Sequence, residues 1–400
     1  MSILANATNA LARRTFLSAV ARLKVGKLTV EMPDGTSRTF DSGFVGPSGV
    51  LQVKSNDFFG KVIFHGEIGF GEAYQARLCD SPDLVTLIRL AILNRREVNL
   101  NSGPLKILSK RKNIRLHRGR KNTEEQSKHN IHDHYDLGND FFRLFLDDTL
   151  TYSSAVFKTP EQDLADAQRN KYRRIAEGAK ITQDDHVLEI GSGWGGFAIF
   201  AAGTYGCRVT SLTISKEQFD LAAERIAEAG LSELIDVQML DYRQVIGTYD
   251  KIVSIEMFEA VGAEYFEMFF LKCSEVLRPG GLLSMQVITV PDEDYEAQLN
   301  GANWIQKYIF PGGILPSVEE MKRCNIHTGL TLTSADDIGE HYATTLHQWR
   351  DRFWEHMDEV QAQGFDDHFV QTWDYYLAVC EAGFITRNTG DAQVVFEKAS

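Results

Sequence analysis

The stretch Val187–Phe197, VLEIGSGWGGF, constrains the fold of this chain more than any other. Its apolar residues surround one acid, Glu189, and a cluster of glycines follows at once: Gly191, Gly193, Gly195 and Gly196. This order predicts a buried parallel strand, a tight turn and the first turn of a helix. Glycine adopts positive φ and lets a ligand approach the N–H groups of a helix N-terminus. A chain that simply crosses a sheet uses the same turn, so ligand binding needs further evidence.

The strands predicted after this turn distinguish two classes of nucleotide ligand. A dinucleotide site places an acid at the end of the next strand, about 20 residues on, to hold a ribose. The next predicted strand, Arg208–Thr213, ends without an acid. A later strand over residues 237–242 reaches Asp241, and Tyr249–Ile255 is predicted as a further strand. Together these features are similar to the class I methyltransferases, which bind S-adenosylmethionine, and they disfavour NAD.

Length, charge and cysteine content limit the class of protein. A chain of 400 residues exceeds one ordinary core, so two domains are expected. The net charge of −13 argues against a general nucleic-acid binder. The five cysteines form no C-x-x-C pair, which suits a reducing compartment and gives neither a metal site nor a disulfide framework. The sequence shows neither an apolar run of about 18 residues nor a signal peptide, so a cytoplasmic location is expected.

The N-terminal segment has two interpretations. It carries several basic residues and no acid before Glu31: Arg13, Arg14, Arg22, Lys24 and Lys27. Apolar residues fall near helical spacing over the same stretch: Leu11, Phe16, Leu17, Val20 and Leu23. A basic amphipathic helix could rest on anionic lipid. A helix docked on its own domain, with a solvated basic face, explains the pattern equally well.

Residues 27–75 show strand patterning, with a turn at Pro33–Gly35. A dense apolar group follows, which is expected to be mostly core, although it could line a lipid groove: Phe58, Phe59, Val62, Ile63 and Phe64. A helix is predicted over Leu84–Leu93. Residues 1–105 therefore form a small α+β domain, and residues 106–128 a basic linker. That linker is either solvated or binds an anionic membrane. In the second case each basic residue near the surface contributes about 1 kcal/mol of binding free energy.

Residues 129–157 are rich in Tyr, His, Asp and Phe. His132 and His134, with Asp133 and Asp136, raise the question of a metal site. No second pair at metal-ligand spacing follows, so we predict no metal and a hydrogen-bonded cap over the cofactor.

The chain resembles the cyclopropane-fatty-acyl-phospholipid synthase family over residues 129–396. The motifs that carry the resemblance are, in order, HYDLGNDFF, TYSSA, VLEIGSGWGG, LTISKEQ, MLDYR, MFEAVG, YIFPGGILPS and HYATTLHQW. The resemblance implies an α/β, Rossmann-like class I methyltransferase domain over 129–400 with helical lid and acyl-channel insertions. Residues 301–317 are expected to form part of that lid or rim. The N-terminal part resembles the accessory lipid-binding domain of bacterial and plant members.

The family's activity is methylene transfer from S-adenosylmethionine to the cis double bond of an unsaturated phospholipid acyl chain. An apolar slot must position a poorly nucleophilic alkene. Methyl transfer leaves a carbocation, which aromatic faces and a carboxylate stabilise. The resemblance implies that bound bicarbonate then removes a proton and the ring closes. The alternative is a fatty-acyl C-methyltransferase that gives a methyl-branched or methylene product. An enzyme peripheral to the inner membrane, on an anionic surface, follows from either activity, and a homodimer is compatible with both.

The resemblance carries catalytic residues onto this chain position by position. Glu259 of MFEAVG, Tyr342 of HYATTL and the backbone of Ile288 match the residues that hold bicarbonate. Two positions differ from the commoner family pattern. Ser154 stands where that pattern has cysteine, and Gln286 where it has histidine, as in plant-like members. Both side chains can still donate a hydrogen bond to an anion.

The resemblance also implies how the cofactor is held. Tyr152 and Ser153 cover the methionine end, with Gly191 and Gly193 beneath it. The ribose lies near Thr213 and Gln218, and the adenine near Asp241 and Tyr242. Each of these polar residues can alternatively serve a turn or cap a helix, as Thr213 and Ser215 can at the helix that carries Gln218.

Overall fold

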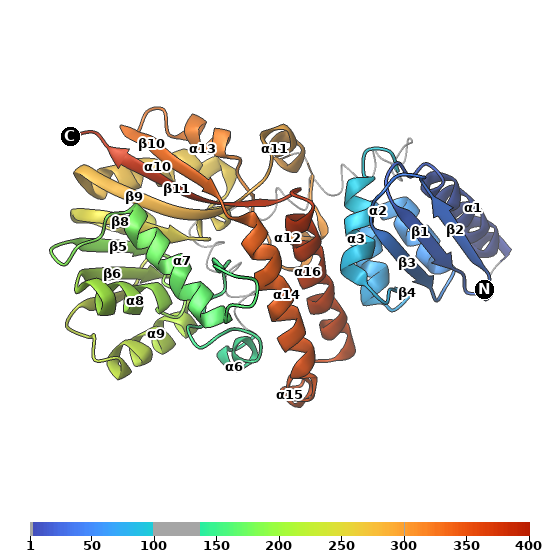
Figure 1. The fold of residues 1–400 in the computed structure, drawn as a ribbon, viewed down its shortest axis with the longest axis horizontal. Helices are drawn as coiled ribbons and strands as arrows, with labels where there is room; N and C mark the ends of the chain where they lie inside the picture. Colours follow the sequence, from blue (N-terminus) through green and yellow to red (C-terminus); the bar gives the residue numbers. More distant parts are fainter. Residues whose placement is uncertain (1–2, 99–136, 300) are drawn as a thin grey trace. The chain divides into compact units, whose positions relative to one another are not determined.

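The computed structural model describes residues 3–98, 137–299 and 301–400 (Figure 1). These residues divide into two compact units. The first unit combines the N-terminal segment with Gly301–Ile309 and Met357–Asn388. The second unit contains the glycine-rich turn, Phe310–His356 and Thr389–Ser400. The predicted basic linker, the limit at residue 105 and the histidine-rich stretch up to Asp136 lie outside the described residues, and the predicted domain limits stay predictions.

The first unit contains a four-stranded sheet of order β2-β1-β3-β4. Its strands are β1 (Lys27–Glu31), β2 (Ser37–Asp41), β3 (Ser48–Val53) and β4 (Cys79–Asp80). β1 and β2 form an antiparallel hairpin, while β1 and β3 run parallel. The hairpin turn is the predicted one, and Gly35 has a φ of 79° there.

The helices of the first unit come from both ends of the chain. They are α1 (Ile3–Val20), α2 (Asp57–Gln75), α3 (Leu84–Leu93), α12 (Trp304–Tyr308), α15 (Met357–Ala362) and α16 (Asp367–Ile385). The helix predicted over Leu84–Leu93 is confirmed as α3. The prediction of strand patterning as far as residue 75 is wrong beyond Val53. Phe58, Phe59 and Val62 share one buried helical face of α2, and this spacing outweighs the strand propensity of single residues.

Helix α1 docks on its own unit through its apolar face. The Phe16 ring centroid lies 5.5 Å from those of Phe58 and Phe59, and all three side chains are buried. The interpretation of this segment as a helix docked on its own domain therefore holds for the apolar side of α1. Arg14 and Arg22 are exposed, and whether the basic side contacts lipid stays a prediction.

The second unit is built on a seven-stranded sheet of order β10-β11-β9-β8-β5-β6-β7. Its strands are β5 (His186–Ile190), β6 (Arg208–Thr213), β7 (Ile235–Met239), β8 (Tyr249–Ile255), β9 (Leu277–Thr289), β10 (Leu330–Asp337) and β11 (Gly390–Lys398). The five strands β5–β9 are parallel to their neighbours, and β11 pairs antiparallel with β9 and β10. This mixed sheet confirms the predicted α/β class I methyltransferase fold.

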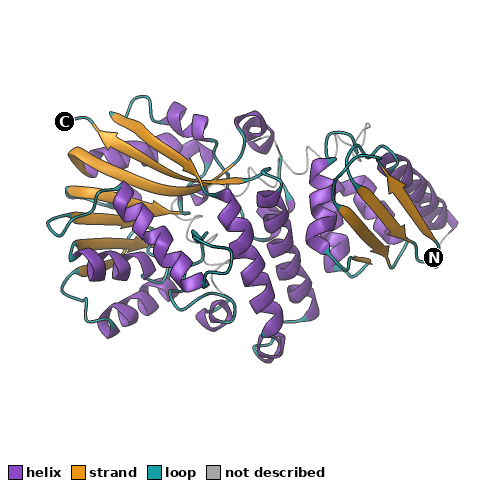
Figure 2. Cartoon of the chain, viewed as in Figure 1, coloured by secondary structure: helices purple, strands orange, loops and turns teal. Residues whose placement is uncertain are grey.

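Helices cover both faces of this sheet (Figure 2). They are α6 (Asn139–Arg143), α7 (Leu164–Gly178), α8 (Gly196–Tyr205), α9 (Lys216–Glu228), α10 (Phe266–Val276), α11 (Asp292–Leu299), α13 (Val318–Cys324) and α14 (Gly339–Glu355). Because strand side chains alternate, Val187 and Leu188 enter different cores, one on each face. Burial on both faces explains why β5 is almost continuously apolar.

The order of the parallel strands locates a ligand crevice. From β5 the chain passes through α8 to β6 on one side, and it later returns to β8 on the other side. Ligands of open α/β sheets bind at such a switch point, beyond the carboxyl ends of the strands. The glycine-rich turn leaves β5 at this point. In the described part of the chain, no helix has the length and apolar character needed to cross a bilayer.

Candidate active site

The glycine-rich turn presents open backbone at the end of β5. Gly191 and Gly193 have φ values of 96° and 48°, and a side chain at Gly193 would meet no atom within 4 Å. Gly195, with a φ of 83°, is the N-cap of α8. A Cβ at Gly196 would collide with the Tyr172 hydroxyl of α7. Gly193 thus leaves room for a ligand, whereas Gly196 is required by packing.

Glu189 brings a buried carboxyl group to the same edge of the sheet. It precedes the last residue of β5 and is 2% exposed. Its partner is the Ser211 hydroxyl of β6, which donates a hydrogen bond to it. Burial raises the pKa of Glu189 to about 8, because a carboxylate loses its hydration in this environment.

The residues predicted near the ribose form a connected group at the end of β6. The Thr213 hydroxyl donates to Gln218 Oε1 at 2.9 Å, and Ser215 caps α9 by accepting from the Gln218 N–H at 3.3 Å. Ser215 therefore has the helix-capping role considered from the sequence. The same contacts fix the amide of Gln218 at the crevice, and its role toward the ribose stays a prediction.

The residues predicted near the adenine lie at a short helical turn after β7, η1 (Tyr242–Gln244). Asp241 caps this turn and accepts from Arg243 Nε at 2.8 Å and Nη2 at 2.6 Å. The Tyr242 ring packs against Phe269 at 5.4 Å, and its buried hydroxyl has no hydrogen-bond partner among the residues that the structure describes. The open backbone at Gly193 and this unpaired hydroxyl fit a nucleotide-like cofactor in the crevice, although the adenine contacts stay predictions.

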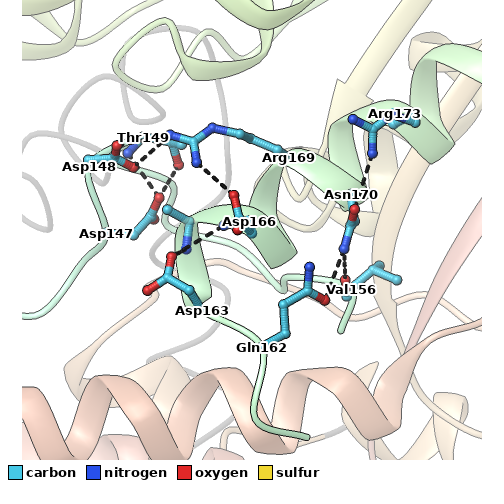
Figure 3. Close-up of polar contacts among 11 residues, drawn as sticks. Asp147, Asp148, Thr149, Val156, Gln162, Asp163, Asp166, Arg169, Asn170 and Arg173 are labelled. Atoms are coloured by element: carbon cyan, nitrogen blue, oxygen red, sulfur yellow. Dashed lines mark hydrogen bonds and ion pairs between the residues drawn. The ribbon is translucent and has the colours of Figure 1, made fainter. Parts of the chain in front are cut away.

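Polar contacts hold the segment before α7 against that helix (Figure 3). Asp148 forms an ion pair with Arg169 at 2.9 Å. Asn170 donates to the Val156 carbonyl at 3.3 Å and to Gln162 at 3.0 Å. The backbone between these anchors contains the TYSSA motif, whose serines therefore lie beside α7.

Two buried residues of α7 fix Ser153. Gln168 Nε2 donates to the Ser153 carbonyl at 2.9 Å, and Lys171 Nζ donates to the Ser153 hydroxyl at 2.7 Å. Lys171 is fully buried. Burial lowers the pKa of Lys171 to about 8, and the negative charges of Glu256, Asp391 and Asp147 act in the opposite direction. The site therefore contains a buried amine close to several acids.

Aromatic side chains form a continuous wall from the glycine-rich turn to Tyr342. The Phe142 ring lies 5.0 Å from Trp194 of the turn and 5.3 Å from Tyr152. Tyr152 stacks on Trp349 at 5.3 Å, and Trp349 meets the edge of Tyr342 at 6.1 Å. We call these five side chains the aromatic wall. Such a surface can pack against an acyl chain and present π faces to a cation.

The central acid of the site is Glu256, the residue that follows β8. Its Oε1 accepts from the Ser154 N–H at 2.8 Å and from Gln286 Nε2 at 2.7 Å. Its Oε2 accepts from the Tyr342 hydroxyl at 2.7 Å. Burial raises the pKa of Glu256, while the charge of Lys171 and these hydrogen bonds act to lower it. The structure thus brings together three of the predicted residues, around a carboxylate that the sequence pattern did not single out.

Two further acids lie next to Glu256. Glu259, in η2 (Phe258–Ala260), accepts from the Ile288 N–H through Oε1. In the described ranges its buried Oε2 has no hydrogen-bond partner. Burial and the nearby charge of Glu256 raise the pKa of Glu259 to about 8. Asp391 is fully buried, accepts from Gln286 Nε2 at 3.1 Å, and has a pKa held well above the usual range by burial and by the other acids.

This donor set does not fit a bicarbonate ion while Glu256 is in place. The Ser154 and Gln286 groups that the resemblance assigns to the anion are directed at Glu256, as is the Tyr342 hydroxyl. The Ser154 hydroxyl donates instead to the Ala155 carbonyl at 3.0 Å. The Ile288 N–H, which the resemblance also assigns to bicarbonate, donates to Glu259 rather than to Glu256. The acids of the chain itself are therefore the candidate proton acceptors at this site.

Three residues of the site were missed from the sequence: Glu256, Lys171 and Asp391. An acid directly after the predicted strand Tyr249–Ile255 was a usable signal, because ligands bind beyond that end of the sheet. Lys171 and Asp391 gave no such signal, since lysine and aspartate side chains usually face solvent. In the described ranges, no group of three or more His, Cys, Asp or Glu side chains is placed to hold a metal.

A sequence profile of the family described as mycolic acid cyclopropane synthetase matches residues 122–394. The chain belongs to this family. Tuberculostearic acid methyltransferase UfaA1 of Mycobacterium tuberculosis is 41% identical over 328 residues, which are 80% of this chain and 76% of the relative. The cyclopropane-fatty-acyl-phospholipid synthase of Escherichia coli K12 is 33% identical over 358 residues, or 87% of either protein.

A solved structure of the same family supports the cofactor assignment. Mycolic acid cyclopropane synthase CmaA1, complexed with SAH and CTAB, matches with a TM-score of 0.63 at 29% identity. The match covers 68% of this chain and 98% of CmaA1. The predicted resemblance is confirmed, and the family is one of S-adenosylmethionine-dependent lipid methyltransferases.

Glu189→Gln should change the pH dependence of stability. In the wild type the folded state retains a proton on Glu189 up to a pKa of about 8, against an ordinary 4.5. This proton contributes its full stabilisation below the unfolded-state pKa of 4.5. The stabilisation is lost as the pH rises through the folded-state pKa of about 8. The free energy of unfolding should therefore fall by about 3 kcal/mol more in the wild type than in the variant between pH 5 and 8.

Urea denaturation of the cofactor-free protein, followed by tryptophan fluorescence, measures this difference. Glu228→Gln, on the exposed end of α9, is the matched control and should behave like the wild type. Parallel pH curves for wild type and Glu189→Gln would show that Glu189 does not retain its proton.

Proposed function

We propose that the chain methylates the cis double bond of an unsaturated phospholipid acyl chain, and that loss of a proton from the added methyl group closes a cyclopropane ring. The observation that carries this proposal is the buried acid cluster at the end of β8, reached from the glycine-rich turn along the aromatic wall. S-adenosylmethionine supplies an electrophilic methyl group when bound. The residues of this chain position the alkene, stabilise the cation and remove the proton.

Positioning the alkene is the first task of the site. An alkene is a weak nucleophile, so rate depends on holding both of its carbons close to the methyl donor. Tyr152, which is partly exposed, stacks on the fully buried Trp349 and offers its ring to the alkene. Gly191 and Gly193, with Ser153 above them, hold the methionine end of the donor, while Gln218 and Tyr242 face its nucleoside. The burial of this region excludes water that would add to a cation.

Stabilising the carbocation is the second task. The faces of Trp349 and Tyr342 attract a cation through their π electrons, and this attraction grows when the site is dry. The carboxylates add a larger effect, because a negative charge in a low-dielectric environment acts strongly on a nearby positive charge. Glu259 adds such a negative charge when the pH exceeds its pKa of about 8.

Removing a proton is the third task. A base works best when its pKa lies near the working pH. Glu259 has a pKa of about 8, and burial moves the pKa of Glu256 in the same direction, upward from its ordinary value. The proton leaves the added methyl group, and the C–H electron pair closes the ring.

A second product is supported by the comparison with UfaA1, a relative named as a tuberculostearic acid methyltransferase that is 41% identical to this chain. The same methyl transfer and the same base give a methylene product when a hydride first shifts along the chain. That product is the fatty-acyl C-methyltransferase alternative. The two outcomes differ in how the acyl chain is held, and both use the same acids.

Membrane contact is assigned to the first unit. A surface groove of about 470 Å³ on α1 and β2 is lined with basic side chains, among them Arg13, Arg14 and Arg38. In the loop before β3, Phe44 and Val45 are 70% and 100% exposed. Basic side chains and exposed apolar residues on the same unit are suited to an anionic lipid surface, so we assign the chain a peripheral position on the cytoplasmic side of the inner membrane.

Expression in a host fed with oleate should test the reaction and its product. With a deuterated methyl donor, ring closure should give a product with two deuteriums in an added CH2 group and resistance to hydrogenation under mild conditions. A methylene product carries the same mass but is hydrogenated. Mass spectrometry of lipid extracts before and after hydrogenation separates the two. Unchanged lipids in a host that contains folded protein would contradict the proposed function.

Glu259→Gln should lower turnover by roughly 100-fold or more, the usual contribution of a positioned acid or base. Affinity for S-adenosylmethionine, measured by calorimetry, should stay within about twofold, because Glu259 contacts Ile288 rather than the predicted cofactor residues. Glu264→Gln, an exposed acid nearby in the sequence, is the control and should keep full turnover. Near-normal turnover of Glu259→Gln would remove Glu259 from the mechanism.

Co-sedimentation with anionic vesicles should weaken as salt is added. Replacing Arg14 and Arg22 together by alanine should reduce vesicle binding by roughly 10- to 30-fold, at about 1 kcal/mol per basic residue. Lys158→Ala, an exposed change in the second unit, is the control. Equal binding by wild type and the double variant would exclude Arg14 of α1 and Arg22, just after α1, from the membrane contact.

A further inference from the structure

We propose that Glu256 is the proton acceptor of the reaction and takes the place that the resemblance gives to bicarbonate, so that this chain works without that ion. This inference rests on the proposed function, in either of its product forms. It differs from the resemblance on one point, the identity of the anion. An amino-acid side chain, rather than a small molecule from solution, supplies the negative charge and the base.

The contacts around Glu256 fit an anion built into the chain. The Ser154 N–H, Gln286 Nε2 and the Tyr342 hydroxyl all donate to its carboxylate, at 2.7–2.8 Å. These donors come from the TYSSA segment, β9 and α14, so distant parts of the second unit converge on one carboxylate. Charge-assisted hydrogen bonds of this kind are short and strong.

The hydrogen bonds are distributed unevenly over the two oxygens of the Glu256 carboxylate. Among the described residues, Oε1 accepts from Ser154 and Gln286, and Oε2 accepts from Tyr342. The buried carboxyl group of Asp391 also lies within hydrogen-bonding reach of Glu256. Oε2, which carries fewer of these bonds, takes the proton. In the step, the methyl C–H bond breaks, its electron pair forms the new C–C bond, and the proton ends on Glu256.

The backbone at Glu256 is held in an uncommon conformation. Its φ is 47°, in the left-handed region that glycine adopts readily and a glutamate rarely adopts. The Glu256 N–H donates to the Gln286 carbonyl at 2.8 Å, which fixes the residue beside β9. A residue strained in this way is retained when its surroundings require the side chain, and such residues concentrate at active sites.

The replacement of histidine by Gln286 is consistent with a fixed internal anion. Gln393 Nε2 donates to Gln286 Oε1 at 3.0 Å, which turns the other end of the amide, Nε2, toward Glu256. An amide donates without titrating, so the hydrogen bond to Glu256 persists at any working pH. Lys171 supplies a buried positive charge near the same acid. Together these groups act against the effect of burial, which raises the pKa of Glu256.

Turnover of the full-length protein in bicarbonate-depleted and bicarbonate-supplemented buffer tests the inference. The assay uses S-adenosylmethionine and vesicles of an anionic phospholipid with cis-unsaturated chains. The wild type should turn over equally in both buffers. The turnover of Glu256→Gly should fall by at least about 100-fold in depleted buffer. Bicarbonate should restore part of this turnover. Glycine adopts the positive φ at this position without strain, and the loss of the carboxylate leaves three hydrogen-bond donors for the ion. Glu256→Gln keeps the shape and should be equally slow in both buffers.

Two controls separate catalysis from folding. Calorimetric affinity for S-adenosylmethionine should be unchanged in both Glu256 variants, and Glu264→Gln should match the wild type in both buffers. A wild type that loses activity when bicarbonate is removed would overturn the inference and leave the proposed function intact. Full activity of Glu256→Gly in depleted buffer would do the same. A wild type that makes no product in either buffer would refute the proposed function and this inference with it.

Discussion

The cost of burying negative charge governs the site. Glu256, Glu259 and Asp391 lie together, and burial alone would make each of them neutral. The charge of Lys171 and the hydrogen bonds to Glu256 oppose that tendency. The balance gives acids whose pKa values lie above the ordinary range, as a base that works near neutral pH requires. The fold therefore has to keep this region dry and hold the donors rigidly at the same time.

Rigid elements meet that requirement by approaching from several directions. β8 delivers Glu256 and η2 delivers Glu259 at the carboxyl edge of the sheet, while β9 brings Gln286 and the backbone of Ile288 alongside. α14 contributes Tyr342 from a distant part of the sequence. The segment before α7 completes the set, since its contacts with that helix fix the serines of TYSSA (Figure 3). A site placed on strands and helices holds its geometry better than one placed on loops.

The comparisons and the geometry address different levels of the function. Family membership places the chain among S-adenosylmethionine-dependent lipid methyltransferases, and its relatives include one named as a cyclopropane-fatty-acyl-phospholipid synthase and one named as a tuberculostearic acid methyltransferase. The proton acceptor is common to both reactions, so the acid cluster supports the shared chemistry. In the proposed mechanism, the product depends on how the acyl chain lies against the aromatic wall when the proton leaves.

Local patterns in the sequence determined much of the fold and several positions of the site. The strands Arg208–Thr213 and Tyr249–Ile255, the helix Leu84–Leu93 and the turn after β5 follow from apolar periodicity and glycine placement, which act over a few residues. Only the tertiary structure decided that α2 is helical and that Lys171 and Asp391 are buried. Only the tertiary structure also shows that the hydrogen-bond donors predicted to hold bicarbonate, from Ser154, Gln286 and Tyr342, donate to Glu256. These outcomes depend on contacts between residues far apart in the chain, where burial and charge are set by neighbours that no local pattern reveals.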